Sequence, residues 1–231
     1  MKKLLVIAVL SAVLTAGSGP AQAADECDGL MVCVPVAGPW VVVPTGPGVP
    51  RPEVEYQLTC PRGYIVGGLD ARLSDRGINI TFIGKLGSPV NPGITTSRSV
   101  VFVASYVGAT ARAPSFRPFI GCMPASGGGG IPTAFGAVKP GEPTIRRVGR
   151  VRVLPGSSTV ASACRVRETL VDASHAVAFG TPTPPSASVV GTVQAARAVR
   201  GRRVVVSVRG DAELGRIRAV VQVHAVCSRV R

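Results

Sequence analysis

The chain has 231 residues, 26 of them Lys or Arg and 12 Asp or Glu, which gives a formal net charge of +14 at pH 7. This length is sufficient to bury a sizeable core in one or two domains. Aromatic residues make up 4% of the chain and there are two histidines, so the composition argues against recognition by aromatic stacking and against a His-rich metal site.

Residues 1–23 have the three parts of a signal peptide. Lys2 and Lys3 precede an apolar run that extends from Leu4 to about Ala16, and Ala21-Gln22-Ala23 has the small-x-small pattern of a cleavage site. The alternative is a membrane anchor, but the run is shorter than the roughly 20 residues that a spanning helix needs. We therefore expect an exported protein, secreted to the cell envelope or the extracellular space.

Six cysteines follow this segment, and an even number in an oxidising compartment indicates disulfides. The first two bracket five residues with an early Asp-Gly turn signal, and the other four form two intervals of 62 and 63 positions, each with an apolar run before its second cysteine. The predicted pairs are Cys27 with Cys33, Cys60 with Cys122, and Cys164 with Cys227. Zinc is the competing interpretation, but the chain has no Cys-x-x-Cys.

Residues 24–52 form a proline-rich N-terminal arm. Prolines recur from Pro35 to Pro52, and this spacing disfavours both a helix and a central strand. We expect the arm to lie extended over the next unit, with Trp40 buried against it.

Residues 53–124 form the first β unit. Gly67-Gly68 inside an apolar strand indicates a bulge or a close backbone approach, and residues 78–82 alternate as in an amphipathic strand. The run from Val100 to Val107 is apolar on both faces, which favours a central strand, whereas Pro118 favours an edge position for its strand.

Residues 125–143 contain Gly127 to Gly130 and are the candidate linker to a second, basic β unit at residues 144–231. In its last strand, apolar residues 217–227 alternate with a polar face that includes Gln222 and His224. The predicted fold class is therefore all-β, with two tandem, disulfide-stapled, sandwich-like units and an internal repeat.

The sequence Cys60-Pro61-x-Gly63 followed by Gly67-Gly68 resembles a strand of uncharacterised exported bacterial β domains. The resemblance covers about a dozen residues, and the second unit departs from it, because Arg165 stands where proline would and no glycine pair follows. It implies a β fold and supplies no activity.

Positive charge is concentrated in the second unit. Residues 131–231 carry 16 basic and 5 acidic side chains, against 8 and 7 in residues 24–130. Arginine suits forked contacts with phosphate or carboxylate, although a compositional origin of the bias is equally open. The candidate ligand-binding residues are Arg197, Arg200, Arg202, Arg203, Arg209, Arg216 and Arg218. The expected partner is an anionic envelope polymer or another polyanion, bound electrostatically.

Catalytic motifs are lacking. His175 and His224 are the only candidate bases, no Gly-x-Ser-x-Gly elbow occurs, and Asp70 and Asp75 are the acids closest to the glycine-rich strand. The leading hypothesis is a non-enzymatic binding or structural protein without a cofactor. The alternative is a secreted hydrolase whose carboxylate or histidine site is assembled by the fold.

Overall fold

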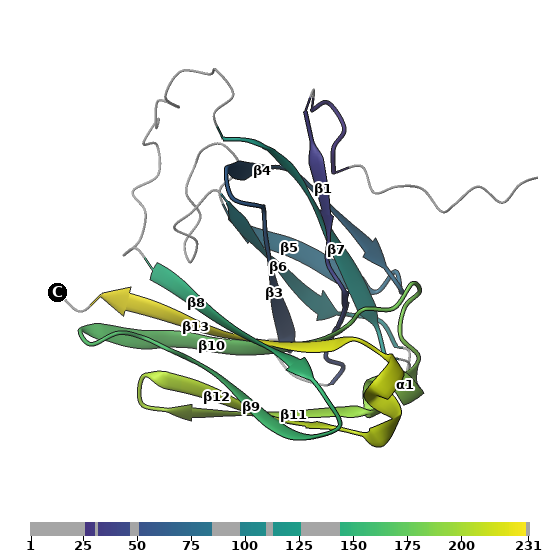
Figure 1. Cartoon of the computed structure of the whole chain (residues 1–231), viewed down its shortest axis with the longest axis vertical. Coiled ribbons are helices and arrows are strands. Elements are labelled where there is room, and N and C mark those ends of the chain that lie inside the picture. The colour runs from purple at the N-terminus through teal and green to yellow at the C-terminus, as the bar shows by residue number, and fades with distance from the viewer. Residues whose placement is uncertain are drawn as a thin grey trace, which may run out of the picture.

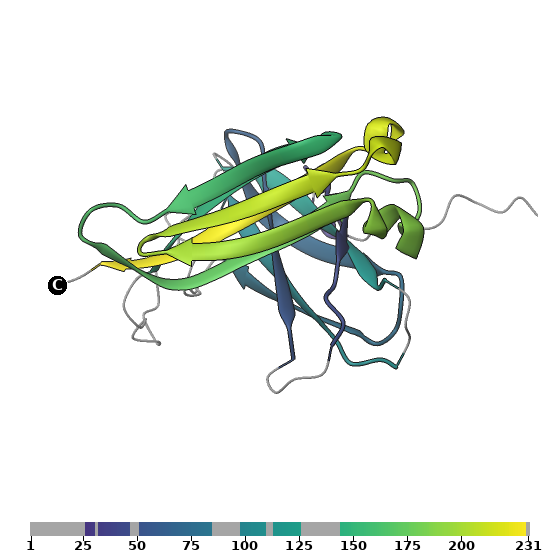
Figure 2. The same ribbon diagram turned by 90° about the horizontal axis from the view of Figure 1, so that it is seen from below.

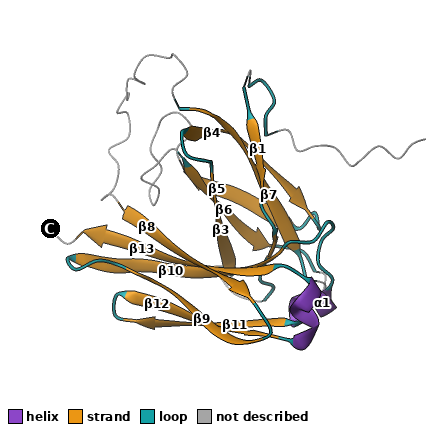
Figure 3. Cartoon of the chain, viewed as in Figure 1, coloured by secondary structure: helices purple, strands orange, loops and turns teal. Residues whose placement is uncertain are grey.

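The structure is a computed structural model, and it describes residues 26–30, 32–46, 51–84, 98–109, 113–125 and 144–229. Within these ranges the protein is all-β with very little helix, as predicted (Figure 3). The predicted signal peptide and all of the predicted linker except Ala125 lie outside the described residues. None of the helices in the described ranges is long and apolar enough to cross a membrane.

Seven strands make up the N-terminal half. They are β1 (Val34–Ala37), β2 (Trp40–Val42), β3 (Glu53–Thr59), β4 (Tyr64–Leu73), β5 (Ile78–Gly84), β6 (Ser99–Tyr106) and β7 (Ser115–Pro124).

Six strands and two short helices make up the C-terminal half. They are β8 (Thr144–Val153), β9 (Gly156–Ala163), β10 (Glu168–Phe179), α1 (Ala187–Gly191), β11 (Val193–Arg200), β12 (Arg203–Gly210), the 3₁₀ helix η1 (Ala212–Arg216) and β13 (Ala219–Arg229).

One large antiparallel sheet runs through both halves. Its order is β1-β7-β2-β10-β13-β8, with β4 also paired to β7. In the N-terminal half it faces the sheet β3-β6-β5, and in the C-terminal half it faces the hairpin β11-β12 and β9 (Figures 1 and 2). Each half therefore has its own apolar core, and the shared sheet connects the two cores.

All three predicted disulfides are present, joining Cys27 to Cys33, Cys60 to Cys122, and Cys164 to Cys227. The two long-range bonds lie in equivalent places. Cys60 follows β3 and reaches β7, and Cys164 follows β9 and reaches β13. Each bond thus connects the two layers of its half of the protein.

The two halves also match in finer detail. The β4–β7 register shifts between Val66 and Gly68, which confirms the predicted bulge, and the β10–β13 register shifts between Leu170 and Asp172. Each bulge lies seven residues after the cysteine that precedes its strand. Gly68 also allows the close backbone approach that was predicted, because a side chain there would collide with the carbonyl group of Glu26.

The predicted position of β6 is confirmed, and two other strand predictions are wrong. Strand β6 is the middle strand of its sheet, between β3 and β5. Strand β2 lies between β7 and β10, so part of the proline-rich arm is a central strand instead of a covering segment. Trp40 in β2 is buried, as predicted.

The strand that contains Pro118 is also internal, because β7 pairs with β4 on one side and with β1 and β2 on the other. The carbonyl group of Pro118 accepts a hydrogen bond from the Gly38 N–H at 2.8 Å. Gly38 lies in the break between β1 and β2. The sheet has no ladder hydrogen bond at this point that would require the N–H group that Pro118 lacks. A side chain at position 38 would collide with the Pro118 ring.

Strand β13 is buried on both faces, so its predicted polar face lies inside the protein. Gln222 and His224 have no exposed surface. Their face of β13 is covered by β3 of the N-terminal half, which the sequence of one strand cannot reveal.

Candidate anion-binding site

The structure separates the seven arginines that the sequence clusters. Arg200, Arg202 and Arg203 lie at the turn between β11 and β12, at one end of the C-terminal half. Arg209, Arg216 and Arg218 lie toward the opposite end, near α1 and η1 (Figure 1).

Arg197 lies apart from both groups. It pairs with the buried Val206 and donates a hydrogen bond to the Ala173 carbonyl group, so it belongs to the inner face of the hairpin.

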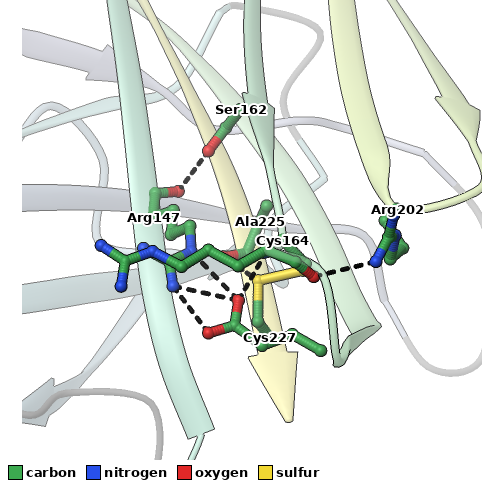
Figure 4. The surroundings of a disulfide bond; sticks show 8 residues. Arg147, Ser162, Cys164, Arg202, Ala225 and Cys227 are labelled. Atoms are coloured by element: carbon green, nitrogen blue, oxygen red, sulfur yellow. Dashed lines mark hydrogen bonds and ion pairs between the residues drawn. A yellow bond between two sulfur atoms is a disulfide. The ribbon is translucent and has the colours of Figure 1, made fainter. Parts of the chain in front are cut away.

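A second turn adds two arginines to the first group. Arg165 and Arg167 lie in the turn between β9 and β10, which is next to the β11–β12 turn. Cys164 N–H donates to the Arg202 carbonyl group at 3.0 Å, and Arg202 Nη1 donates to the Arg165 carbonyl group at 3.1 Å (Figure 4). We call the exposed set Arg165, Arg167, Arg200, Arg202 and Arg203 the arginine tip.

The disulfide of the C-terminal half fixes the base of the arginine tip. Cys164 is the residue immediately before the β9–β10 turn, and its bond to Cys227 connects that turn to β13 (Figure 4). The turn itself closes through a hydrogen bond from Glu168 N–H to the Arg165 carbonyl group at 3.1 Å. The backbone that carries these arginines is therefore constrained by covalent and hydrogen bonds.

The acid at the base of the tip is already neutralised. Arg147 Nη2 contacts Glu168 Oε1 at 2.7 Å, and Arg165 N–H donates to Glu168 Oε2 at 2.7 Å. The hydrogen bonds from Arg147 and from the Arg165 backbone hold the pKa of Glu168 below its ordinary value. Glu168 is therefore an ionised group paired with Arg147, and of the arginines of the tip its charge acts on Arg165.

A polar network at the junction of the two halves contains a second buried ion pair. Arg146 in β8 forms a forked ion pair with Glu55 in β3, with nitrogen to oxygen distances of 2.5 and 3.0 Å. Ser174 in β10 also donates to Glu55. Burial raises the pKa of Glu55, but the hydrogen bonds and charge of Arg146 outweigh this effect, so the pKa lies below its ordinary value.

His224 extends this network as a neutral group. Arg146 Nη1 lies 3.0 Å from His224 Nδ1, and since a guanidinium can only donate, Nδ1 accepts and the ring proton is on Nε2. Nε2 then donates to Gln222 Oε1 at 2.5 Å. Burial, reinforced by the charge of Arg146, lowers the pKa of His224 to about 3.

Gln222 connects the network to the edge of β3. Its Oε1 accepts from the Gln57 N–H at 2.6 Å, and its Nε2 donates to the Gln57 carbonyl group at 3.2 Å. The side-chain amide thereby takes the place of a neighbouring strand along this part of the edge. The network is a structural joint, because its serine and its histidine are not bonded to one another in the manner of a nucleophile and its base.

His175 lines a different pocket, of about 300 Å³, together with Glu53, Ser174 and Arg197. Burial and then the charge of Arg197 lower its pKa. Among the described residues His175 makes no hydrogen bond to Glu53 or to Ser174, whose hydroxyl group donates to Glu55. The pocket thus brings a histidine and an acid together without an activated nucleophile.

The two acids singled out in the sequence have local roles. Asp70 Oδ1 accepts from the Ala71 N–H inside β4, and Asp75 Oδ1 accepts from the Gly77 N–H in the turn after β4. Such contacts are typical of aspartates that shape their own backbone.

One set of described residues has the spacing of a metal site, namely Cys164, Glu168 and Cys227, whose ligand atoms lie within 4.8 Å of one another. The disulfide between the two cysteines removes both thiolates, so the set cannot ligate a metal in this state.

The sequence missed Arg165 and Arg167 because they lie 30 or more positions before the run of arginines from Arg197 to Arg218. The one signal that could have included them is the shared layout of the two halves, which places the turn after Cys164 beside the next hairpin. A comparison of the chain with protein-family models, with curated proteins and with solved structures found no match to any of them.

Proposed function

We propose that the protein is an exported, non-enzymatic binding protein that holds an anionic polymer of the cell envelope or its surroundings on the arginine tip. The observation that supports this most directly is the juxtaposition of two turns with five exposed arginines and no free acid in either turn. The three disulfides are typical of proteins that work in oxidising compartments.

The cross-strand geometry of the tip favours an anionic partner. Arg200 and Arg203 are direct partners in the antiparallel ladder, next to Gly201, whose φ of 56° is typical of a tight hairpin turn. Like charges directly opposite each other destabilise a hairpin, so this pair has a cost that a bound anion would relieve. Arginine also presents its donors in a fork that matches phosphate and carboxylate groups.

The proposal is tested by measuring heparin binding to the full chain between 50 and 200 mM salt. If three to five arginines neutralise anionic groups, affinity should fall by roughly tenfold to a thousandfold over this range. The variant Arg200→Glu/Arg203→Glu should weaken binding at low salt. The matched control Arg62→Glu/Arg76→Glu changes the same charge at exposed positions of the N-terminal half and should weaken binding much less.

Equal loss in both variants would leave net charge, and not the tip, as the cause of binding. Binding that does not depend on salt would contradict the proposal directly.

We also propose that the two halves are one β unit used twice. The matched disulfides, bulges and post-cysteine turns support this. The tip then arises where the second copy carries Arg165 and Arg167 at the positions of Pro61 and Gly63 in the first.

A hydrolase remains the second candidate, on the single observation that His175 and Glu53 line one pocket. An ester or glycoside hydrolase activity that is lost in His175→Gln, with the fold retained, would favour it over the binding role.

A further inference from the structure

A second basic site lies far from the arginine tip, in a pocket of about 590 Å³ between the two halves. Arg117 from β7, Arg152 from β8 and Arg218 just before β13 line it. None of the residues that line the pocket is acidic. Three positively charged guanidinium groups thus share one cavity without a counter-charge in its wall.

Two of these arginines are unused by the fold. Arg152 and Arg218 are exposed, and their side chains make no hydrogen bond or ion pair with any described residue. Arg218 was among the candidate binding residues, whereas Arg117 and Arg152 are brought to it only by the fold.

Arg117 is held in place by two contacts within the protein. Its Nε donates to the Gly38 carbonyl group at 2.9 Å, and its guanidinium carbon lies 5.4 Å from the centre of the Phe119 ring. These contacts orient the guanidinium group and leave its two terminal nitrogens as donors for another acceptor.

Tyr56 adds a hydroxyl group to the wall of this pocket. It lines the same pocket and is 4% exposed, yet its hydroxyl group makes no hydrogen bond with any described residue. A ligand oxygen in the pocket would give this hydroxyl group a partner.

We propose that this pocket binds a small polar molecule with two or more negative charges on phosphoryl or carboxylate groups. The three arginines require multiple negative charges, and the neutral remainder of the wall, which includes Gly38, Pro39, Gly180 and Thr181, leaves room for a compact uncharged part. The volume is within the range of pockets that hold ligands of this size. Because its walls come from both halves, the occupied pocket would also connect them.

The test is calorimetric titration of the full chain with pyrophosphate and with citrate at 150 mM salt, with acetate as the singly charged comparison. Pyrophosphate or citrate should bind once per chain and at least tenfold more tightly than acetate. Arg152→Gln/Arg218→Gln should weaken this binding by about ten- to a hundredfold, the loss expected when one or two charge-assisted hydrogen bonds are removed. Tyr56→Phe should weaken it by a few-fold.

The control Arg202→Gln/Arg203→Gln removes the same charge from the arginine tip and should leave the titration unchanged while it weakens heparin binding. We expect the double variant to fold, because Arg152 and Arg218 are exposed and make no hydrogen bond or ion pair with the described residues. If it unfolds, the single variant Arg218→Gln replaces it in the titration. The absence of binding by the wild-type chain to both probes would overturn the proposal, as would equal weakening by the tip control. Neither result bears on heparin binding at the tip.

Discussion

Arg167 occupies a backbone conformation that suits glycine. Its φ is 71°, and it is the one described residue other than glycine with a positive φ. Gly63, at the same place in the turn after Cys60, has a φ of 81°. A side chain in the left-handed region costs roughly 1–2 kcal/mol, so the arginine is kept at a cost in stability.

We predict that Arg167→Gly raises the free energy of unfolding by roughly 0.5–1 kcal/mol, since relief of the strain exceeds the extra entropy that glycine gives the unfolded chain. The same variant should weaken heparin binding, because it removes one arginine of the tip. Urea unfolding with the disulfides intact measures the first effect. Arg165→Gly is the control, as Arg165 has no positive φ, and a similar gain there would show that strain is not the cause.

The position of a strand in its sheet was predictable where the residue pattern along the strand reflects its packing. The run from Val100 to Val107 indicates a central strand because both of its faces are apolar, and the structure places β6 between two partners. Disulfide pairing was predictable because the two long intervals match. These features depend on the local residue pattern and on the matched spacing of the cysteines, both of which can be read from the sequence.

Strand β2 and Pro118 show where the pattern fails. Four apolar residues between prolines do not predict a central strand, yet β2 fills the gap between β7 and β10. Pro118 is tolerated inside the sheet because Gly38 interrupts the neighbouring strand at that point. In both cases the deciding contact comes from a distant segment.

The edge of β3 gives a prediction at the scale of elements. Gln222→Leu would leave the Gln57 N–H and the His224 Nε2–H without their acceptor, although Arg150 would still donate to the Gln57 carbonyl group. Each unpaired buried donor costs about 1–3 kcal/mol, so we expect a loss of roughly 2–5 kcal/mol in the free energy of unfolding.

Gln194→Leu is the matched control, because Gln194 is exposed on β11, and it should change stability by less than about 0.5 kcal/mol. If Gln222→Leu were as stable as the wild type, the side-chain amide would not be replacing a strand at this edge.

At the scale of the whole molecule, the sequence indicates positive charge but not its arrangement. Counting arginines along the chain groups Arg197 with Arg203, which face opposite sides of one hairpin. The pocket between the halves unites Arg117, Arg152 and Arg218, which no spacing in the sequence connects. The candidate sites therefore depend on the way the two halves are joined.

That joint should make the protein sensitive to acid. His224 has a pKa of about 3 in the folded protein and an ordinary value near 6.5 when unfolded, so between these values only the unfolded chain takes up a proton there. Stability should therefore fall as pH decreases from about 6.5, by up to about 1.4 kcal/mol per pH unit. Below the ordinary pKa of Glu55, whose folded value is lowered, protonation of the unfolded chain at that residue adds to the loss.

We predict that His224→Gln reduces the slope of unfolding free energy against pH by roughly half to one proton between about pH 5.5 and 6.5, a window that lies above most of the titration of Glu55 in the unfolded chain. The variant should also be less stable at pH 7, since it disturbs the contacts to Arg146 and Gln222. Urea unfolding across this range measures both. His175→Gln is the control. The pKa of His175 is also lowered in the folded protein, so its titration changes stability with pH in the same direction, but His175 lies outside the joint between the halves. An unchanged slope in His224→Gln would mean that His224 is already protonated in the folded protein. The joint between the halves would then be a cluster of three charged groups, and not an ion pair beside a neutral histidine.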